Sequence, residues 1–161
     1  MDRPAPLAPE SGFPRGATVL LVEDDAVLGR RILAYLEDRG AEVSCARSLA
    51  EARNLLRAER HDFVLLDMHL PDGSGLALLR EGSVSEATGI VAMTAYGGIE
   101  QAVEAMRLGA GDYLTKPFEL EAVPLAFLRC RAQRRATRRD EQRGAGAAGE
   151  PDLFFGDSLA E

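Results

Sequence analysis

The amino-acid sequence predicts an α/β fold, in which a doubly wound, five-stranded parallel sheet lies between two layers of helices. Two observations support this prediction. Five short apolar runs, several of them rich in β-branched residues, recur along the chain, and segments with helical apolar spacing separate them. Parallel strands need crossover connections, which are usually helices that cover both faces of the sheet. The alternation therefore predicts a three-layer α/β/α sandwich.

The first strand and the first helix carry clear signals. The run ATVLLVEDD at 17–25 is apolar until it ends in acidic residues, which is typical of a buried parallel strand. The segment 26–39 predicts a helix, and Gly40 supplies a common C-terminal cap residue. The apolar residues that share one stripe of this helix are Leu28, Ile32, Tyr35 and Leu36.

The middle of the chain repeats this alternation. AEVSCA at 41–46 predicts the second strand, and SLAEARNLLRAE at 48–59 predicts a helix that opens with a Ser-x-x-Glu capping box. DFVLLDM at 62–68 predicts the third strand. The helix predicted for SGLALLRE at 74–81 is short, because Gly82 ends it.

The last part of the alternation contains two strands and two helices. GIVAMT at 89–94 predicts the fourth strand, and IEQAVEAMRLG at 99–109 predicts a helix that ends at a glycine. GDYLT at 111–115 predicts the fifth strand. We expect a final helix from near Leu120, although Pro124 should kink this helix or delay its start, because proline lacks the N–H group.

Length, charge and cysteine content restrict the class of protein. A chain of 161 residues with a net charge of −7 suits one soluble domain with tails, and argues against direct nucleic-acid binding by this domain. No apolar run is long enough to span a membrane, and residues 1–16, with four prolines, predict a disordered leader without a signal-peptide core. Cys45 and Cys130 have neither metal-site nor disulfide spacing, so we expect two reduced thiols in a cytoplasmic protein.

Polar residues follow four of the predicted strands at their carboxyl ends, where ligands bind to doubly wound sheets. Taken singly, each aspartate could cap the next helix, the threonine could bond to local backbone, and the lysine could be a solvated surface group. Several acidic groups at one edge repel one another, however, and this repulsion indicates a bound cation. The residues in question are Glu23, Asp24 and Asp25 after the first strand, Asp67 after the third, Thr94 after the fourth and Lys116 after the fifth.

Four motifs resemble those of the receiver domain of two-component response regulators. They are LLVEDD, LLDMHLPDGSG, VAMTAYG and GAGDYLTKPF, in this order, and the resemblance covers about 17–131. It implies a flavodoxin-like sheet with strand order 2-1-3-4-5. It also implies a domain that accepts a phosphoryl group from a sensor histidine kinase. Such a domain is not an enzyme, beyond Mg²⁺-dependent self-phosphorylation and slow self-dephosphorylation.

The resemblance also implies the residues of a phosphorylation site. Asp67 aligns with the phosphoacceptor, and Glu23 and Asp24 align with the acidic pair that binds Mg²⁺, with Asp24 as the direct ligand. Asp25 falls one place beyond this pair. His69 would contribute only its backbone carbonyl to the metal. A histidine beside carboxylates also fits a transition-metal ligand, but an oxygen-rich site favours Mg²⁺.

Four further residues align with the parts of the receiver domain that respond to phosphorylation. Thr94 matches the hydroxyl residue, Tyr113 the switch aromatic, and Lys116 the lysine that the family places in front of a cis Pro117. Tyr113 could instead be a half-buried strand residue without a switching role. Lys116 is the one lysine among 19 basic residues, and its compact ammonium can meet an acceptor oxygen and a phosphoryl oxygen, whereas the arginine fork is built for bidentate pairing.

The resemblance places the output surface on the fourth helix, the fifth strand and the fifth helix. We expect Ala102, Met106 and Tyr113 to line this surface, which would also serve a homodimer. Residues 132–161 predict a helical linker and a flexible tail. The final residues, FFGDSLAE, resemble the opening of the ATPase domain in NtrC-like activators, which implies ATPase and DNA-binding output domains in the full-length protein.

Other functions remain open at this point. The arginine-rich stretch 129–143 fits a solvated helix extension, a dimer linker or a basic arm. The chain could also be a stand-alone relay module, or a docking domain that is never phosphorylated. A Mg²⁺-dependent phosphatase with an aspartyl nucleophile would carry a second aspartate two places after the first, and His69 stands at that place.

Overall fold

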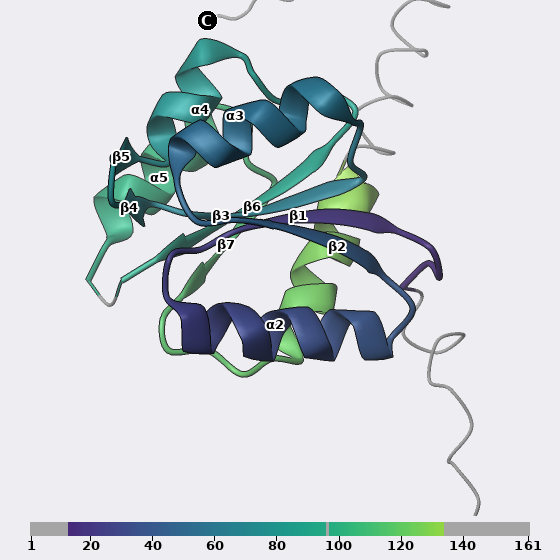
Figure 1. The fold of residues 1–161 in the computed structure, drawn as a ribbon. Helices are drawn as coiled ribbons and strands as arrows, with labels where there is room; N and C mark the ends of the chain where they lie inside the picture. The colour runs from purple at the N-terminus through teal and green to yellow at the C-terminus, as the bar shows by residue number, and fades with distance from the viewer. Residues whose placement is uncertain (1–12, 96, 134–161) are drawn as a thin grey trace, which may run out of the picture. The chain divides into compact units, whose positions relative to one another are not determined.

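The computed structural model describes residues 13–95 and 97–133 (Figure 1). No helix in this part of the chain is both long and apolar enough to cross a membrane. The chain divides into a compact unit, Met1–Cys130, and a second unit, Arg131–Glu161, of which residues 131–133 are described and helical. The expectations for residues 1–12 and 134–161 lie outside the described residues.

Five parallel strands form the central sheet in the order β2-β1-β3-β6-β7 (Figure 1). Because β6 and β7 are the fourth and fifth strands of this sheet along the chain, the predicted order 2-1-3-4-5 and the doubly wound fold are confirmed. The chain reverses direction across the sheet between β1 and β3, so the crevice at their carboxyl ends is the place where a ligand is expected. The strands are β1 (Thr18–Val22), β2 (Glu42–Ala46), β3 (Phe63–Asp67), β6 (Gly89–Thr94) and β7 (Asp112–Thr115).

A two-stranded hairpin that the sequence did not predict follows β3 directly. It pairs β4 (His69–Leu70) with β5 (Gly73–Ser74) in antiparallel register. Strands of two residues are too short to show a periodic pattern in the sequence. The hairpin lies at the carboxyl edge of the sheet, beside the start of α3 (Figure 1).

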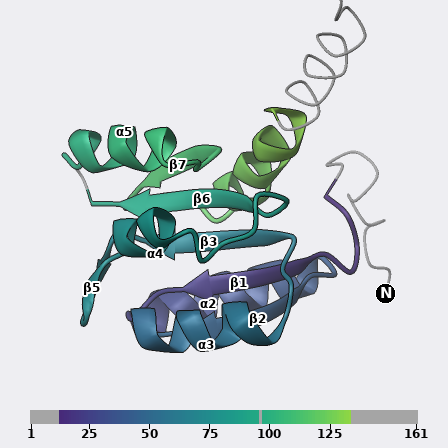
Figure 2. The same ribbon diagram turned by 90° about the horizontal axis from the view of Figure 1, so that it is seen from above.

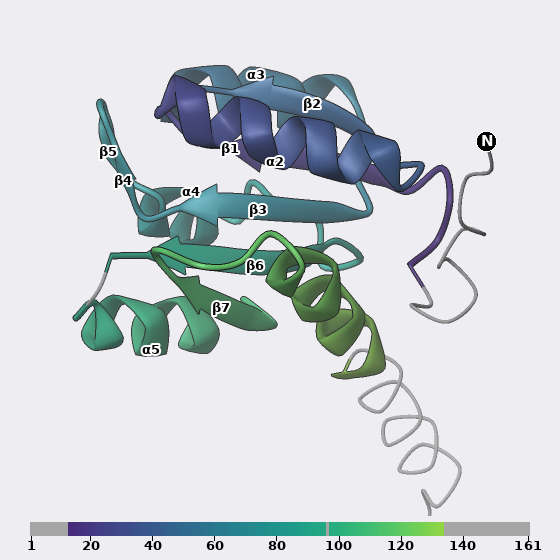
Figure 3. The ribbon, with the colours of Figure 1, turned by 90° about the horizontal axis from the view of Figure 1, so that it is seen from below.

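Helices cover both faces of the sheet, as the three-layer prediction requires. Figure 2 shows the face with α3, α4 and α5, and Figure 3 shows the opposite face with α2 and the last helix. The described part of the last helix spans residues 122–133. The other helices are α2 (Ala26–Asp38), α3 (Leu49–Ala58), α4 (Leu76–Glu81) and α5 (Ile99–Arg107).

Each buried strand supplies both hydrophobic layers, because successive side chains of a strand point to opposite faces. In β1, Val19 and Leu21 pack in the cluster that contains α2 and the last helix, whereas Leu20 and Val22 pack in the cluster with α3, α4 and α5. β3 and β6 divide in the same way. The continuous apolar runs of the sequence therefore reflect burial on both faces, which holds the carboxyl ends of the strands in fixed positions.

Phe13 contradicts the prediction of a disordered leader through residue 16. Its side chain is 3% exposed and stacks on Phe63 and Phe127, with ring centroids 6.3 and 6.2 Å away. Phe63 and Phe127 stack on each other at 4.4 Å. The prolines around Phe13 hid this contact, because they indicate an extended segment but do not show whether its aromatic residue reaches a core.

Pro124 delays the last helix. The helix begins at residue 122, after turns in which Ala122 N–H and Val123 N–H donate to the carbonyls of Glu119 and Leu120. Pro124 therefore falls in the first helical turn, where a backbone N–H has no partner within the helix. Of the two outcomes expected for this proline, the structure shows the later start.

Gly75 is required by space at the start of α4. A Cβ atom at this position would lie against the Asp67 carbonyl oxygen, 2.8 Å from Met68 Cε and 3.0 Å from Leu66 Cγ. The backbone itself is ordinary, with φ −57° and ψ −23°. We predict that Gly75→Ala lowers the free energy of unfolding by about 1–3 kcal/mol, as overpacking does, which urea denaturation would measure.

Gly29 provides the matched control for this prediction. It lies within α2, and the nearest contact of an added Cβ is Glu23 Cγ at 4.0 Å. Because alanine is the better helix former, Gly29→Ala should raise the free energy of unfolding by up to about 1 kcal/mol. If both substitutions stabilised the protein, Gly75 would not be packed as tightly as described.

Candidate functional site

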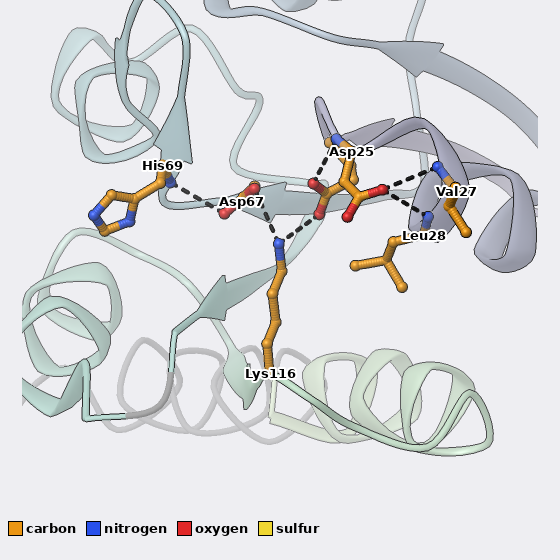
Figure 4. A network of polar contacts seen from close by, with 7 residues as sticks. Asp25, Val27, Leu28, Asp67, His69 and Lys116 are labelled. Carbon is orange, nitrogen blue, oxygen red and sulfur yellow. Dashed lines mark hydrogen bonds and ion pairs between the residues drawn. The ribbon is translucent and has the colours of Figure 1, made fainter.

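Four strands bring the predicted site residues to one edge of the sheet. Glu23 follows β1, Asp67 ends β3, Thr94 ends β6 and Lys116 follows β7. These strands are neighbours in the sheet, so residues far apart in the sequence meet at their carboxyl ends. Figure 4 shows Lys116 reaching towards Asp67 across this edge.

Three carboxylates form the centre of the site. One ligand oxygen from each of Glu23, Asp24 and Asp67 lies within 4.8 Å of the others. Glu23 and Asp67 are 4% and 5% exposed, whereas Asp24 is exposed to solvent. Carboxylates at this spacing repel one another, and hard divalent cations such as Mg²⁺ and Ca²⁺ prefer such oxygen ligands. The donor set therefore fits Mg²⁺, with open access on the Asp24 side.

Lys116 supplies a positive charge within this cluster. Its Nζ donates to Glu23 Oε1 at 2.7 Å and to Asp67 Oδ2 at 3.1 Å (Figure 4). Burial opposes protonation of this amine, but the hydrogen bond to Glu23 and the charges of Asp67 and Glu23 outweigh burial and raise the pKa of Lys116. The amine is therefore a fixed ammonium between two carboxylates.

All four oxygens of the two buried carboxylates accept hydrogen bonds. Glu23 Oε2 accepts from Asp25 N–H at 3.0 Å, in addition to the bond that Oε1 receives from Lys116. Burial raises the pKa of Glu23, and these two hydrogen bonds only partly offset it. Asp67 Oδ1 accepts from His69 N–H at 3.0 Å, which fixes the plane of the carboxylate together with Lys116.

Thr94 is a buried site residue with unused hydrogen-bonding capacity. Its side chain is 1% exposed, and its hydroxyl has no hydrogen-bond partner among the described residues. A buried polar group without a partner is costly, so such groups are rare and often mark a binding site. Thr94 Oγ is thus available to a polar ligand at the edge of the sheet.

The remaining predicted residues divide between the site and its surroundings. Asp25 caps α2, since its Oδ1 accepts from Val27 N–H at 2.9 Å and from Leu28 N–H at 3.1 Å (Figure 4). The His69 ring points away from Asp67 (Figure 4), and no metal-binding group found among residues 13–95 and 97–133 includes it. This arrangement gives no support to a transition-metal site.

On the other side of the site, the Lys116–Pro117 peptide bond is cis. Tyr113 lies on β7 with 41% of its surface exposed.

Two features of the site had no signal in the sequence. Arg47, after β2, donates from Nη2 to the Asp24 carbonyl at 3.3 Å. A pocket of about 440 Å³ also opens beside Lys116. It is lined by Asp25, Val27, Leu28 and Arg31 from the start of α2, by Ala95, and by Lys116, Pro117 and Phe118. Such contacts depend on how distant segments pack.

The fold and the site have clear relatives among known proteins. Residues 19–127 match the family model "Response regulator receiver domain". The virulence transcriptional regulatory protein PhoP of Salmonella typhimurium is 38% identical over 106 residues, which cover 65% of this chain and 47% of PhoP. The regulatory protein AtoC of Escherichia coli is 36% identical over 112 residues, which cover 69% of this chain and 24% of AtoC.

A solved structure shares the same fold. It is a response regulator protein from Burkholderia pseudomallei with a phosphorylated aspartic acid, a calcium ion and citrate, with a TM-score of 0.65 and 29% identity over 86% of this chain and 77% of that one. The chain spans about half the length of PhoP and about a quarter of AtoC. Because the family model covers most of the chain, the protein belongs to the response regulator receiver domain family.

Proposed function

We propose that this protein is a phosphorylation switch in which Asp67 accepts a phosphoryl group from a phosphohistidine of a sensor histidine kinase. The observation that carries the proposal is the contact of Asp67 Oδ2 with Lys116 Nζ inside a group of three carboxylates. The Burkholderia pseudomallei relative contains a phosphorylated aspartic acid and a calcium ion, which supports the same chemistry here.

The residues that would hold Mg²⁺ are Glu23, Asp24, Asp67 and the carbonyl of His69. Their all-oxygen donor set is the one that Mg²⁺ prefers. When bound, the ion would reduce the repulsion between an anionic acceptor and an anionic phosphoryl group. Glu23 has its oxygens engaged by Lys116 and by Asp25 N–H, and Asp24 is exposed, so Asp24 is the better placed of the pair for direct ligation.

The side chains of the site would act on the transfer in distinct ways. An oxygen of Asp67 forms a bond to phosphorus, and the bond between phosphorus and the donor imidazole nitrogen breaks. Lys116 stays protonated and balances the charge on the acceptor and the phosphoryl oxygens. Thr94 Oγ–H, which has no partner among the described residues, donates to a phosphoryl oxygen. The product is an acyl phosphate on Asp67.

Phosphorylation would then shift the population of conformations at the α5–β7 side of the domain. The phosphoryl group adds close to two negative charges and three acceptor oxygens. Thr94 and Tyr113 would respond to this added group. Thr94 ends β6 and pairs with Thr115 of β7, the strand that carries Tyr113. We infer that this movement reaches the surface formed by α5, β7 and the last helix.

This output surface differs in detail from the expectation. Ala102 is buried at 1% exposure and packs inwards, so its assignment to the surface was wrong. Met106 and Tyr113 are exposed as expected, together with Ile99 and Val103 of α5. An exposed apolar group of this kind suits a protein partner. We propose that it serves a homodimer or an attached output domain.

The relatives indicate what kind of output this receiver would control. PhoP is a transcriptional regulatory protein and AtoC a regulatory protein, and both are longer than this chain. We propose that the receiver controls a transcription-activating output, and the resemblance of residues 154–161 to the opening of the NtrC-like ATPase domain favours an output of that type. A sensor kinase and an output domain would then be its main partners.

Incubation with acetyl phosphate and Mg²⁺ tests the proposed function. We expect intact-mass measurement to find one added phosphoryl group, and none when a chelator removes the metal. Phosphorylation that is unaffected by the chelator would contradict the proposed role of the three carboxylates.

A further inference from the structure

Asp72 links the start of α3 to the hairpin that follows Asp67. It lies in the turn between β4 and β5. Its Oδ1 accepts from Leu49 N–H at 2.8 Å, and its Oδ2 accepts from Ala50 N–H at 3.1 Å. The hydrogen bond from Leu49 N–H lowers the pKa of Asp72 the most, and the bond from Ala50 N–H also lowers it. The carboxylate therefore stays ionised. The turn is thereby fixed to the first turn of α3.

The turn and α3 are also in close steric contact. Gly73 follows Asp72, and a Cβ atom at this position would lie 3.0 Å from Leu49 Cδ1. Leu49 is buried and cannot easily move aside. The tip of the hairpin therefore has one well-defined position against α3.

The base of the same hairpin contacts the site. His69 pairs with Ser74 across the hairpin, and His69 N–H donates to Asp67 Oδ1 at 3.0 Å. A continuous series of contacts thus runs from α3 through Asp72 and the β4–β5 pairing to the carboxylate of Asp67. A shift of the turn would move the donor that sets the plane of this carboxylate.

We propose that Asp72 is a positioning residue for Asp67, which holds the hairpin so that His69 N–H orients the acceptor carboxylate. This inference rests on the proposed function of Asp67. The proposed role of Asp72 goes beyond capping α3, because this helix has a second cap at Ser48. Ser48 Oγ accepts from Glu51 N–H at 3.1 Å, a contact that stays within α3 and does not involve the hairpin.

The two caps allow a matched experiment on the full chain with the variants Asp72→Asn and Ser48→Ala. Each variant removes one acceptor at the same end of α3, since the amide nitrogen of asparagine cannot accept a hydrogen bond. We expect thermal unfolding to show a few degrees of destabilisation in both. The rate of labelling by acetyl phosphate with Mg²⁺ should fall about tenfold in Asp72→Asn only, because small misplacements of a reacting group are costly.

A second readout needs no phosphorylation. The His69 amide resonance in a ¹⁵N–¹H spectrum reports its hydrogen bond to Asp67, and it should shift in Asp72→Asn but not in Ser48→Ala. Equal effects of the two variants on both readouts, or a wild-type rate and spectrum in Asp72→Asn, would overturn the inference. If the wild-type protein took no label while the His69 resonance still shifted in Asp72→Asn, the proposed function would fail and the positioning contact would stand.

Discussion

Lys116→Arg is expected to slow the Mg²⁺-dependent phosphorylation of Asp67 by at least about tenfold, although the positive charge is retained. The Lys116 ammonium meets Glu23 Oε1 and Asp67 Oδ2 from one nitrogen, at 2.7 and 3.1 Å. A guanidinium is larger and planar, so it cannot occupy this point between two buried carboxylates without displacing one of them. Lys116→Ala should cost more, about a hundredfold, as the loss of one electrostatic contact to a transition state does.

The rate of labelling by acetyl phosphate, followed by intact mass, measures this effect. Arg129→Lys is the matched control, because it makes the reverse exchange in an exposed ion pair with Asp112, at 2.7 Å. This control should label at the wild-type rate. Wild-type labelling of Lys116→Arg would show that any positive charge suffices, and would remove the physical reason for the one lysine of the chain.

Phe13→Ala is expected to lower the free energy of unfolding by about 3 kcal/mol, the lower end of the cost of truncating a buried phenylalanine. Phe13 precedes β1, yet its ring stacks on Phe63 of β3 and on Phe127 of the last helix. Truncation would leave a cavity between the sheet and this helix. The segment before β1 is thus expected to contribute to the stability of the whole fold.

Urea denaturation of Phe13→Ala and of Leu125→Ala would measure this contribution. Leu125 belongs to the same helix as Phe127 but is 52% exposed, so its truncation should change the free energy of unfolding by no more than about 0.5 kcal/mol. Equal stabilities of Phe13→Ala and the wild-type protein would mean that the segment before β1 is not part of the core.

The strands, and the edge of the sheet that carries the site, could be predicted because burial of a strand on both faces leaves a continuous apolar run in the sequence. The apolar runs in 17–25 and 62–68 contain β1 and β3, and their acidic ends became the carboxylates of the site. In a parallel sheet the carboxyl ends of neighbouring strands lie side by side at the same edge. The residue types at those ends were therefore enough to place Glu23, Asp67, Thr94 and Lys116 together.

Features that depend on side-chain packing could not be predicted. α5 shows the limit, because its helical period was clear while Ala102 was assigned to the surface and proved to be buried. Asp72 was not singled out in the sequence, because its bonds to Leu49 and Ala50 exist only where α3 packs beside the hairpin. Phe13 was misassigned for the same reason, because its partner Phe127 lies near the other end of the domain in the sequence.

The central claim is that Asp67 is the phosphoacceptor, and intact mass of three proteins after incubation with acetyl phosphate and Mg²⁺ tests it most directly. Asp25→Asn is the control for Asp67→Asn, because Asp25 caps α2 and asparagine can still accept hydrogen bonds there. We predict one phosphoryl group on the wild-type protein and on Asp25→Asn, and none on Asp67→Asn. Equal labelling of Asp67→Asn and the wild-type protein would contradict the assignment of Asp67.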